Sequence, residues 1–327
     1  MKSLFTLFIC IIAMNTASAQ QQSKDLRYKK YAGRYGNTSG ISLFEDGTFL
    51  LYGYATGVFG RYHFEKDYLL FYPDQQELFE VFAHQNPALG DSTRMNFIGF
   101  ERGSKTFAQF NQDSLQQVFN DDANCFNAPF IHQKAGKTNT LILSSLPGEN
   151  AKPSAAANTS WHYGNKSGYN DFILIHNPPK REYENFSAML SSEAGAELIK
   201  LSNYGGDKGY PKQKPDQEEQ VQWKEFLKWK SQYDQSKGIQ KNQLYANKQG
   251  KVFPEIVSSK YHYEAKTNQY TAIQDQGNHA DDPQNEYNDP RYLRKYGKLH
   301  PETKDKFEGI KAAQKSIFFS VCEKDPE

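Results

Sequence analysis

Hydrophobic and polar residues alternate along residues 31–72, and short polar turns separate the alternating runs. The clearest run is 58–65, whose apolar face consists of Val58, Gly60, Tyr62 and Phe64. A period of two residues is typical of a β-strand with one buried face. Asp46-Gly47 predicts a two-residue hairpin, because both positions of a type I′ turn need a positive φ. These residues are therefore predicted to form an up-and-down antiparallel meander.

Three further apolar runs follow, at residues 78–83, 95–101 and 106–110. We expect them to extend the meander to seven or eight strands, so that residues 24–135 form one antiparallel barrel-like or half-barrel domain. Within this domain, residues 113–119 are predicted to form a short helix. Residues 136–160 are predicted to be a linker, because they contain a small, polar and proline-bearing stretch.

Residues 161–327 are predicted to form a second, mixed α+β domain, which makes the fold class of the whole chain α+β. Pro178-Pro179 precedes Tyr183, Phe186 and Leu190 at helical spacing, which predicts a helix to about Leu190. Residues 192–201 fit either a helix or a strand. The other elements expected here are a buried strand at 171–176, a polar loop at 268–297, a helix at 301–314 and a β run at 316–322.

The strongest helix signal spans residues 216–237, with acidic residues near its start and Lys237-Gly238 at its end. Its aromatic and apolar side chains cover a wide arc: Trp223, Phe226, Leu227, Trp229 and Tyr233. Such an arc packs on a sheet, or it holds a sugar or a partner protein.

The first 19 residues have the pattern of a bacterial-type secretory signal peptide. Lys2 precedes an apolar run at residues 4–13, and Ala17-Ser18-Ala19 gives a small-x-small cleavage pattern. The run is shorter than the roughly 20 apolar residues that span a bilayer. We therefore expect an exported protein, periplasmic or secreted, with no transmembrane segment in the mature chain.

Charge and composition narrow the classes of partner. The chain has 39 Lys and Arg against 38 Asp and Glu, and loss of Lys2 with the signal peptide leaves 38 of each. A balanced charge argues against nucleic acid as a partner, since phosphate neutralisation needs a basic surplus. Hydrophobic residues make up only 37% of the chain, but aromatic residues reach 14%, so we expect a core built largely from rings.

Cys125 and Cys322 are the two cysteines outside the signal peptide. In an oxidising compartment an even pair favours a disulfide, which would join the end of the first domain to the last strand. Two free buried thiols are the alternative.

Three glycine-bearing elements carry a resemblance to a known family: Gly33-x-Tyr35, Asp46-Gly47-x-Phe49 and Gly60-x-Tyr62. They resemble small bacterial lipocalin-like exported β-barrel domains, over roughly residues 28–110. Tyr35 stands where lipocalins carry Trp. The resemblance implies an eight-stranded barrel with an apolar interior, and the expected ligand-binding residues are Tyr35, Phe49, Leu51, Tyr62 and Phe64. These side chains either line a cavity for an apolar or glycan-like ligand or simply fill the interior.

Short catalytic motifs are absent: the sequence has no zinc-protease helix, nucleophile elbow, P-loop or dinucleotide fingerprint. Residues 275–289 are rich in Asp and Asn, which are calcium ligands, but their spacing differs from an EF-hand loop. A general base among scattered histidines is the other candidate chemistry; these are His162, His176, His262 and His279.

We therefore predict an exported, non-enzymatic binding protein of the cell envelope, without a metal or cofactor. It binds either an apolar or glycan-like ligand or another envelope protein. Two alternatives stay open. One is an envelope hydrolase with its site in the C-terminal region, and the other is a structural or assembly factor that docks through the helix at 216–237.

Overall fold

The computed structural model describes residues 25–102, 105–146, 159–193, 195–205, 208–214, 216–239, 242–273, 286–306 and 315–322. The predicted signal peptide lies outside these ranges. The chain divides into two compact units, which the polypeptide visits in alternation. The first unit comprises Met1–Gln76 and Lys180–Gln232, and the second comprises Glu77–Pro179 and Tyr233–Glu327. The predicted boundaries at residues 135 and 160 therefore both fall within the second unit.

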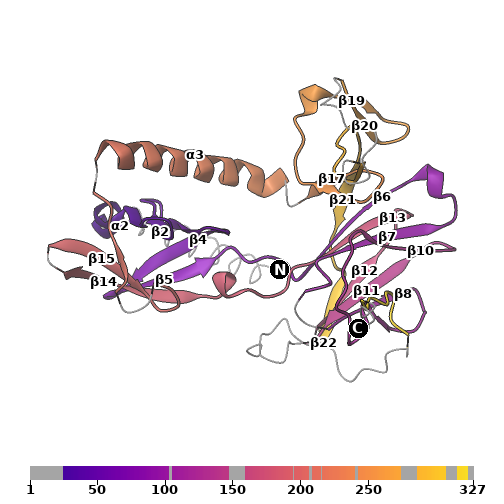
Figure 1. Cartoon of the computed structure of the whole chain (residues 1–327), viewed down its shortest axis with the longest axis horizontal. Helices are drawn as coiled ribbons and strands as arrows, with labels where there is room; N and C mark the ends of the chain where they lie inside the picture. The colour runs from indigo at the N-terminus through magenta and orange to yellow at the C-terminus, as the bar shows by residue number, and fades with distance from the viewer. Residues whose placement is uncertain are drawn as a thin grey trace, which may run out of the picture. The chain divides into compact units, whose positions relative to one another are not determined.

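The first unit contains an antiparallel sheet (Figure 1). In spatial order, its strands are β1 (Gly33–Gly36), β2 (Gly40–Leu43), β3 (Thr48–Gly53), β4 (Thr56–Glu65), β5 (Tyr68–Pro73), β14 (Phe186–Glu193), β15 (Ala196–Leu201) and β16 (Tyr210–Pro211). A bridge between Tyr35 and Lys212 brings the last strand back to the first. The predicted antiparallel barrel-like sheet is thus confirmed.

The predicted hairpin at Asp46-Gly47 exists, but its turn differs from type I′. Gly47 N–H donates to the Phe44 carbonyl at 3.1 Å, and Phe44 N–H donates to the Thr48 carbonyl at 2.9 Å. Gly47 has a φ of 75°, whereas Asp46 lies outside the positive-φ region. A loop with one left-handed glycine at its end is the longer hairpin type that contains a G1 bulge.

Replacing Gly47 with Val is expected to lower the free energy of unfolding by about 1 kcal/mol or more, because a β-branched residue is strained at positive φ. Glu45→Val is the matched control, since the neighbouring position is exposed and lies outside the positive-φ region. Thermal unfolding of both variants checks this. Equal melting temperatures for the two would contradict it.

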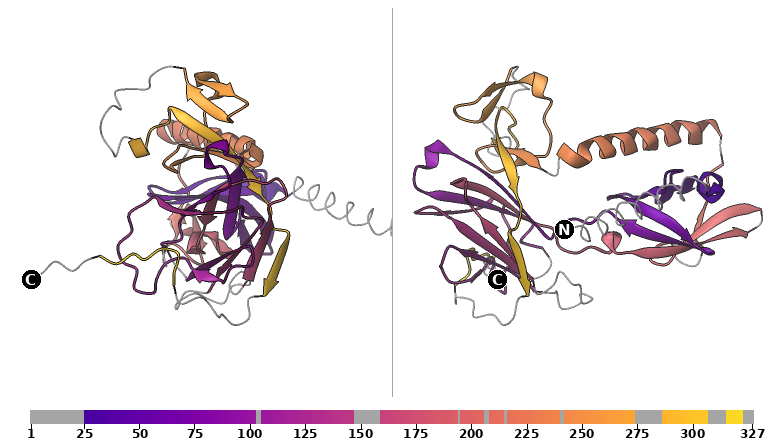
Figure 2. Two further views of the ribbon diagram at one scale, coloured as in Figure 1. Left: turned by 90° about the vertical axis from the view of Figure 1, so that its right-hand side faces the viewer. Right: turned by 180° about the vertical axis from the view of Figure 1, so that it is seen from behind.

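The second unit is a sandwich of two sheets (Figures 1 and 2). The strands of the large sheet are β10 (Phe130–Lys134), β7 (Thr93–Ile98), β13 (Asp171–His176), β6 (Phe79–His84), β21 (Tyr292–Leu299), β17 (Gln243–Ala246) and β18 (Val252–Phe253), with β19 (Tyr261–Glu264) and β20 (Gln269–Ala272) joined through β21. The small sheet contains β22 (Thr303–Lys306), β12 (Thr159–Gly164), β11 (Thr140–Ser145), β8 (Thr106–Phe110) and β9 (Gln116–Gln117). A core of buried rings, including Phe79, Phe97 and Trp161, joins the two.

The helices of the described residues are few, so the chain is mostly β rather than α+β. They include α2 (Leu26–Tyr31), α3 (Gln217–Ile239) and the short 3-10 turns η1 (Pro87–Leu89), η2 (Arg181–Tyr183) and η3 (Ser258–Lys260). The helix predicted at 216–237 is confirmed as α3. Asp216 caps it, because its carboxylate accepts from the Glu219 N–H at 2.8 Å.

Several other element predictions were wrong because the strands find partners far away in sequence. The runs at 78–83, 95–101 and 106–110 form β6, β7 and β8 of the second unit, and β14, β15 and β16 complete the barrel instead. The helix expected after Pro178-Pro179 is the strand β14, and residues 113–119 contain β9. Residues 303–306 are strand β22, and residues 307–314 of that predicted helix lie outside the described ranges. Strands β20 and β21 occupy part of the expected loop at 268–297.

The predicted disulfide between Cys125 and Cys322 is confirmed, with Cα atoms 5.0 Å apart. Residues 316–322 make only an isolated bridge, between Phe119 and Phe318, rather than the expected strand. The Asn124 N–H also donates to the Ser320 carbonyl at 2.9 Å. The disulfide therefore fixes residues 316–322, which have few backbone contacts with the sheets.

Candidate functional site

The structure brings the five predicted ligand-binding residues together inside the barrel. Tyr35, Phe49, Leu51 and Tyr62 are almost fully buried, and Phe64 is partly buried beside them. The inward positions of β3 and β4 alternate with outward ones, so the predicted apolar face was assigned to the correct side of the sheet.

These side chains pack against other rings of the barrel. The Tyr62 ring stacks on Phe71 at 5.7 Å, and the Phe49 ring meets Phe71 edge to face at 5.1 Å. The Tyr62 hydroxyl donates to the Phe44 carbonyl at 3.0 Å, so its polar end is bonded within the protein. Tyr28 of α2 packs on Phe64 at 5.1 Å. The packing favours a filled interior, and ligand binding by these five residues stays a prediction.

Helix α3 lies along the outer wall of the barrel, beside β2, β3 and β4 (Figures 1 and 2). Three ring contacts join the helix to these strands: Trp223 with Phe44 at 5.4 Å, Phe226 with Tyr52 at 5.1 Å, and Trp229 with Phe59 at 5.9 Å. The helix explains why the outward-facing Leu50 and Tyr52 are buried. Most of the predicted aromatic arc therefore packs on the sheet, one of the two roles expected for it.

Two ion pairs hold α3 in this position. Arg34 Nε donates to Glu219 Oε2 at 2.9 Å, and the exposed fractions of the two side chains are only 6% and 11%. Lys230 pairs with Asp46 at 2.9 Å. A buried charge that loses its partner is strongly destabilising, so the first pair determines where the helix lies.

A groove runs beside α3, with a volume of about 390 Å³. Its lining residues in the described part of the chain belong to the helix: Glu225, Phe226, Lys228, Trp229 and Gln232. Trp229 is 44% exposed although its ring contacts Phe59 of the barrel. This α3 groove combines aromatic surface with polar side chains that end in water, and volumes of about 300–1,000 Å³ are typical of small-molecule sites.

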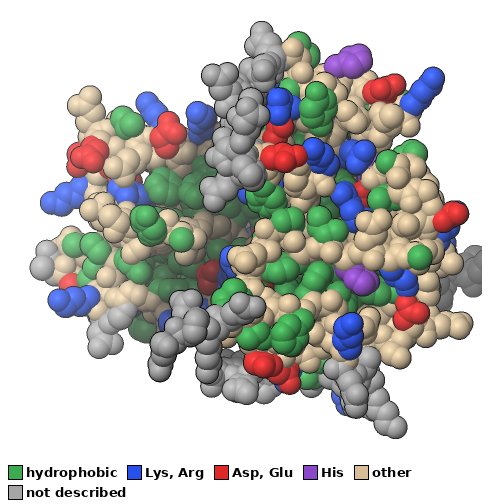
Figure 3. Space-filling view, turned by 45° about the vertical axis from the view of Figure 1, so that its right-hand side comes forward, with side chains coloured by type: hydrophobic (Ala, Val, Ile, Leu, Met, Phe, Trp, Pro, Cys, Tyr) green, Lys and Arg blue, Asp and Glu red, His purple; other side chains and the backbone are tan. Residues whose placement is uncertain are grey.

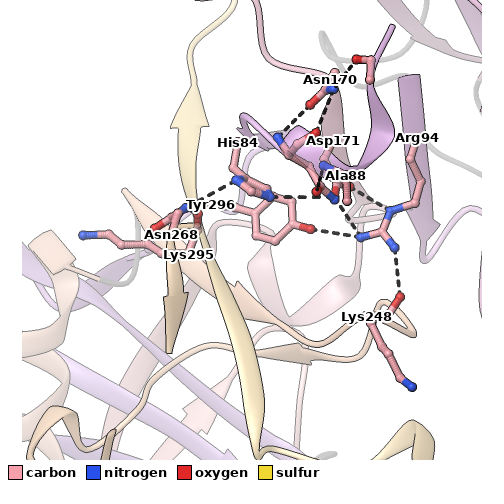
Figure 4. Close-up of polar contacts among 11 residues, drawn as sticks. His84, Ala88, Arg94, Asn170, Asp171, Lys248, Asn268, Lys295 and Tyr296 are labelled. Carbon is pink, nitrogen blue, oxygen red and sulfur yellow. Dashed lines mark hydrogen bonds and ion pairs between the residues drawn. The ribbon is translucent and has the colours of Figure 1, made fainter. Parts of the chain in front are cut away.

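The second unit contains a row of four polar side chains on adjacent strands of the large sheet (Figure 4). We call Arg94, Asp171, His84 and Tyr296 the polar ladder; they come from β7, β13, β6 and β21. Arg94 Nε donates to Asp171 Oδ1 at 2.9 Å, and Arg94 Nη2 donates to Asp171 Oδ2 at the same distance. Asn86 also donates to Asp171 Oδ2, at 2.8 Å. Such bidentate pairing fixes the relative positions of these strands.

His84 is neutral in this environment. Asn268 Nδ2 donates to the Lys295 carbonyl at 2.7 Å, so its amide orientation is fixed, and it lies 3.3 Å from His84 Nδ1. His84 Nδ1 must therefore accept, which places the imidazole proton on Nε2, 3.8 Å from Asp171 Oδ2. Burial lowers the pKa of His84 to about 4; Asp171 opposes this shift, and the cations Arg294 and Arg94 add to it.

The polar ladder has the residue types of a proton-transfer site but the burial of a structural network. Asp171 is 1% exposed and His84 is 3% exposed, so a substrate in solution cannot contact either side chain directly. A general base must reach the proton that it abstracts. The ladder therefore serves to join strands, and sequence reasoning missed it because its members are distant in sequence. The one local signal was Asp171 at the start of an apolar run.

The other predicted chemistry is dispersed. His176 lies in the core of the second unit, and His162 pairs with the exposed Asp305 at 3.2 Å. His262 is exposed, and His279 lies outside the described residues. Residues 275–285 of the Asp- and Asn-rich segment that was considered as a calcium loop also lie outside the described residues. In the described part of the chain, no group of three or more His, Cys, Asp or Glu side chains is placed to hold a metal ion.

On the face drawn in Figure 3, Lys and Arg side chains lie interspersed with Asp and Glu side chains. The helices of the described ranges include none with the length and hydropathy of a membrane span. Comparisons of the chain with family models, curated proteins and solved structures gave no match. The resemblance to lipocalin-like domains thus stays a prediction.

Proposed function

We propose that this protein is an exported, non-enzymatic binding protein of the cell envelope and that its ligand binds in the α3 groove. The observation that carries the proposal is the half-exposed Trp229 ring at a groove of about 390 Å³. When a ligand covers an aromatic ring that is exposed to water beside polar groups, the burial of the ring favours binding.

Two further features support the proposal. The barrel interior is occupied by its own rings, so the outer wall offers aromatic surface that the interior does not. Arg34 and Glu219 hold α3 through a buried ion pair, so the groove is formed before a ligand arrives. A preformed site avoids the ordering cost of binding. The Cys125–Cys322 disulfide fits export, because such bonds persist in oxidising compartments.

Native mass spectrometry of protein purified from its own host tests the proposal. The wild-type chain is expected to carry a small-molecule adduct that Trp229→Ala loses. Leu227→Ala is the matched control: Leu227 is 43% exposed on the same helix but does not line the groove. Both variants keep the Trp223 and Phe226 contacts with the barrel, and thermal unfolding verifies that they fold. An adduct retained in full by Trp229→Ala, or absent from every form, would overturn the proposal.

A further inference from the structure

We infer that the α3 groove takes an uncharged saccharide, one pyranose ring of which stacks on Trp229. This inference rests on the proposed function and names the chemical class of its ligand. Three observations carry it: the fixed orientation of the indole ring, the polar groups around it, and their zero net charge.

The indole of Trp229 is held in place from the barrel side. Its ring meets Phe59 edge to face at 5.9 Å. Gly57 of β4 lies directly against the far edge of the indole: a Cβ at this position would lie 2.9 Å from Trp229 Cη2 and 3.0 Å from Cζ2. Glycine therefore admits the ring where any other residue would displace it. The result is a rigid aromatic surface, which binds at low entropic cost.

The polar groups of the groove supply both donors and acceptors. Gln232 offers an amide that does both, Glu225 accepts, and Lys228 donates. Among the described residues, none of these three side chains has a hydrogen-bond or ion-pair partner. A sugar ring matches this arrangement, because its C–H face is apolar while its hydroxyls donate and accept at the edge.

The charges of the groove favour a neutral ligand. Glu225 and Lys228 contribute one negative and one positive charge three residues apart on the helix, so they cancel. A fatty acid or an anionic sugar would place its charge beside Glu225 without a surplus cation to compensate it. An uncharged saccharide has no such cost.

Isothermal titration calorimetry with defined probes tests the inference. The probes are three neutral trisaccharides (cellotriose, maltotriose and N,N′,N″-triacetylchitotriose), trigalacturonate as an anionic sugar, and laurate as an apolar ligand. At least one neutral trisaccharide is expected to bind, and trigalacturonate and laurate are not. Gly57→Ala is expected to weaken that binding by about tenfold or more, because it moves the Trp229 ring without removing a group that contacts the ligand.

Three controls distinguish a shift of the Trp229 ring from a general loss of structure. Gln232→Ala should also weaken the trisaccharide, whereas Leu227→Ala should not. Near-ultraviolet circular dichroism of Gly57→Ala should show a changed indole signal with an unchanged far-ultraviolet spectrum. Laurate or trigalacturonate binding that depends on Trp229, without any neutral trisaccharide binding, would overturn the saccharide inference and leave the proposed function standing. A response from no probe, together with no Trp229-dependent adduct from the host, would overturn both.

Discussion

Replacement of Arg94 with Met is expected to lower the free energy of unfolding of the second unit by about 3–5 kcal/mol. The guanidinium makes two hydrogen bonds to Asp171, a carboxylate that is only 1% exposed. In the variant, Asn86 is the main remaining donor to that carboxylate. An ionised group left in the interior without its partner keeps the full cost of its desolvation. Urea unfolding followed by the fluorescence of Trp161, which lies in the core of this unit, measures the change when Trp223 and Trp229 are replaced by Phe in every variant compared.

Two variants make the Arg94 experiment specific. Lys137→Met removes an exposed cation of the same unit, 4.0 Å from Asp91, and is expected to cost less than about 1 kcal/mol. Arg94→Met combined with Asp171→Leu removes both charges, so the double variant should be more stable than Arg94→Met alone. A single Arg94→Met variant that unfolds at the wild-type urea concentration would show that the ladder does not hold the sheet together.

The five strands that follow one another in residues 33–73 could be predicted because their partners are neighbours in sequence. Hairpin signals such as Asp46-Gly47 mark where each strand ends, and alternation assigns each side chain to a face. The sheet to which a strand belongs, in contrast, depends on partners that are distant in sequence. The run at 79–84 is as apolar as those before it, yet β6 pairs with β13 and β21 in the second unit. Nothing local in Phe79–His84 specifies those distant partners.

Two of the strands that the sequence analysis missed, β14 and β22, have a local pattern that points to another structure. Tyr183, Phe186 and Leu190 have helical spacing after two prolines, but Phe186, Ala188 and Leu190 also alternate, and pairing with β5 and β15 selects the strand. Residues 303–306 are polar and exposed throughout, so β22 gives no hydrophobic signal. It pairs with β12 through the backbone ladder and through polar contacts such as that of Asp305 with His162. Tertiary contacts decide between the two structures in such cases.

The candidate groove was foreseen only in part. The spacing of Trp223, Phe226 and Trp229 predicted an aromatic arc on a helix. All three rings contact the barrel, which is one of the two roles considered for that arc. Trp229 also stays half-exposed, and binding of a sugar or a partner protein stays a prediction. The role of Gly57 was beyond sequence reasoning, because it depends on contact between β4 and a helix more than 150 residues later in the chain.

Acidification from pH 7 to pH 4 is expected to destabilise the second unit by about 3 kcal/mol for each of two buried histidines. Burial lowers the pKa of His84 to about 4, and burial likewise lowers that of His176 to about 4, against about 6.5 in an unfolded chain. Between these values the unfolded chain binds protons that the folded chain does not. Stability is therefore complete above about pH 6.5 and falls as the pH drops towards 4.

The local geometry explains why His84 resists protonation, and it defines the variants that test the prediction. The added proton would go to Nδ1, which faces the donor amide of Asn268 at 3.3 Å. His84→Gln and His176→Gln should each flatten the dependence of unfolding free energy on pH between 4 and 6.5, measured by urea titration at several pH values. His262→Gln, at an exposed position, should leave it unchanged. If the pH dependence of His84→Gln equals that of the wild-type protein, then His84 titrates normally in the folded state and the donor amide of Asn268 does not control its protonation.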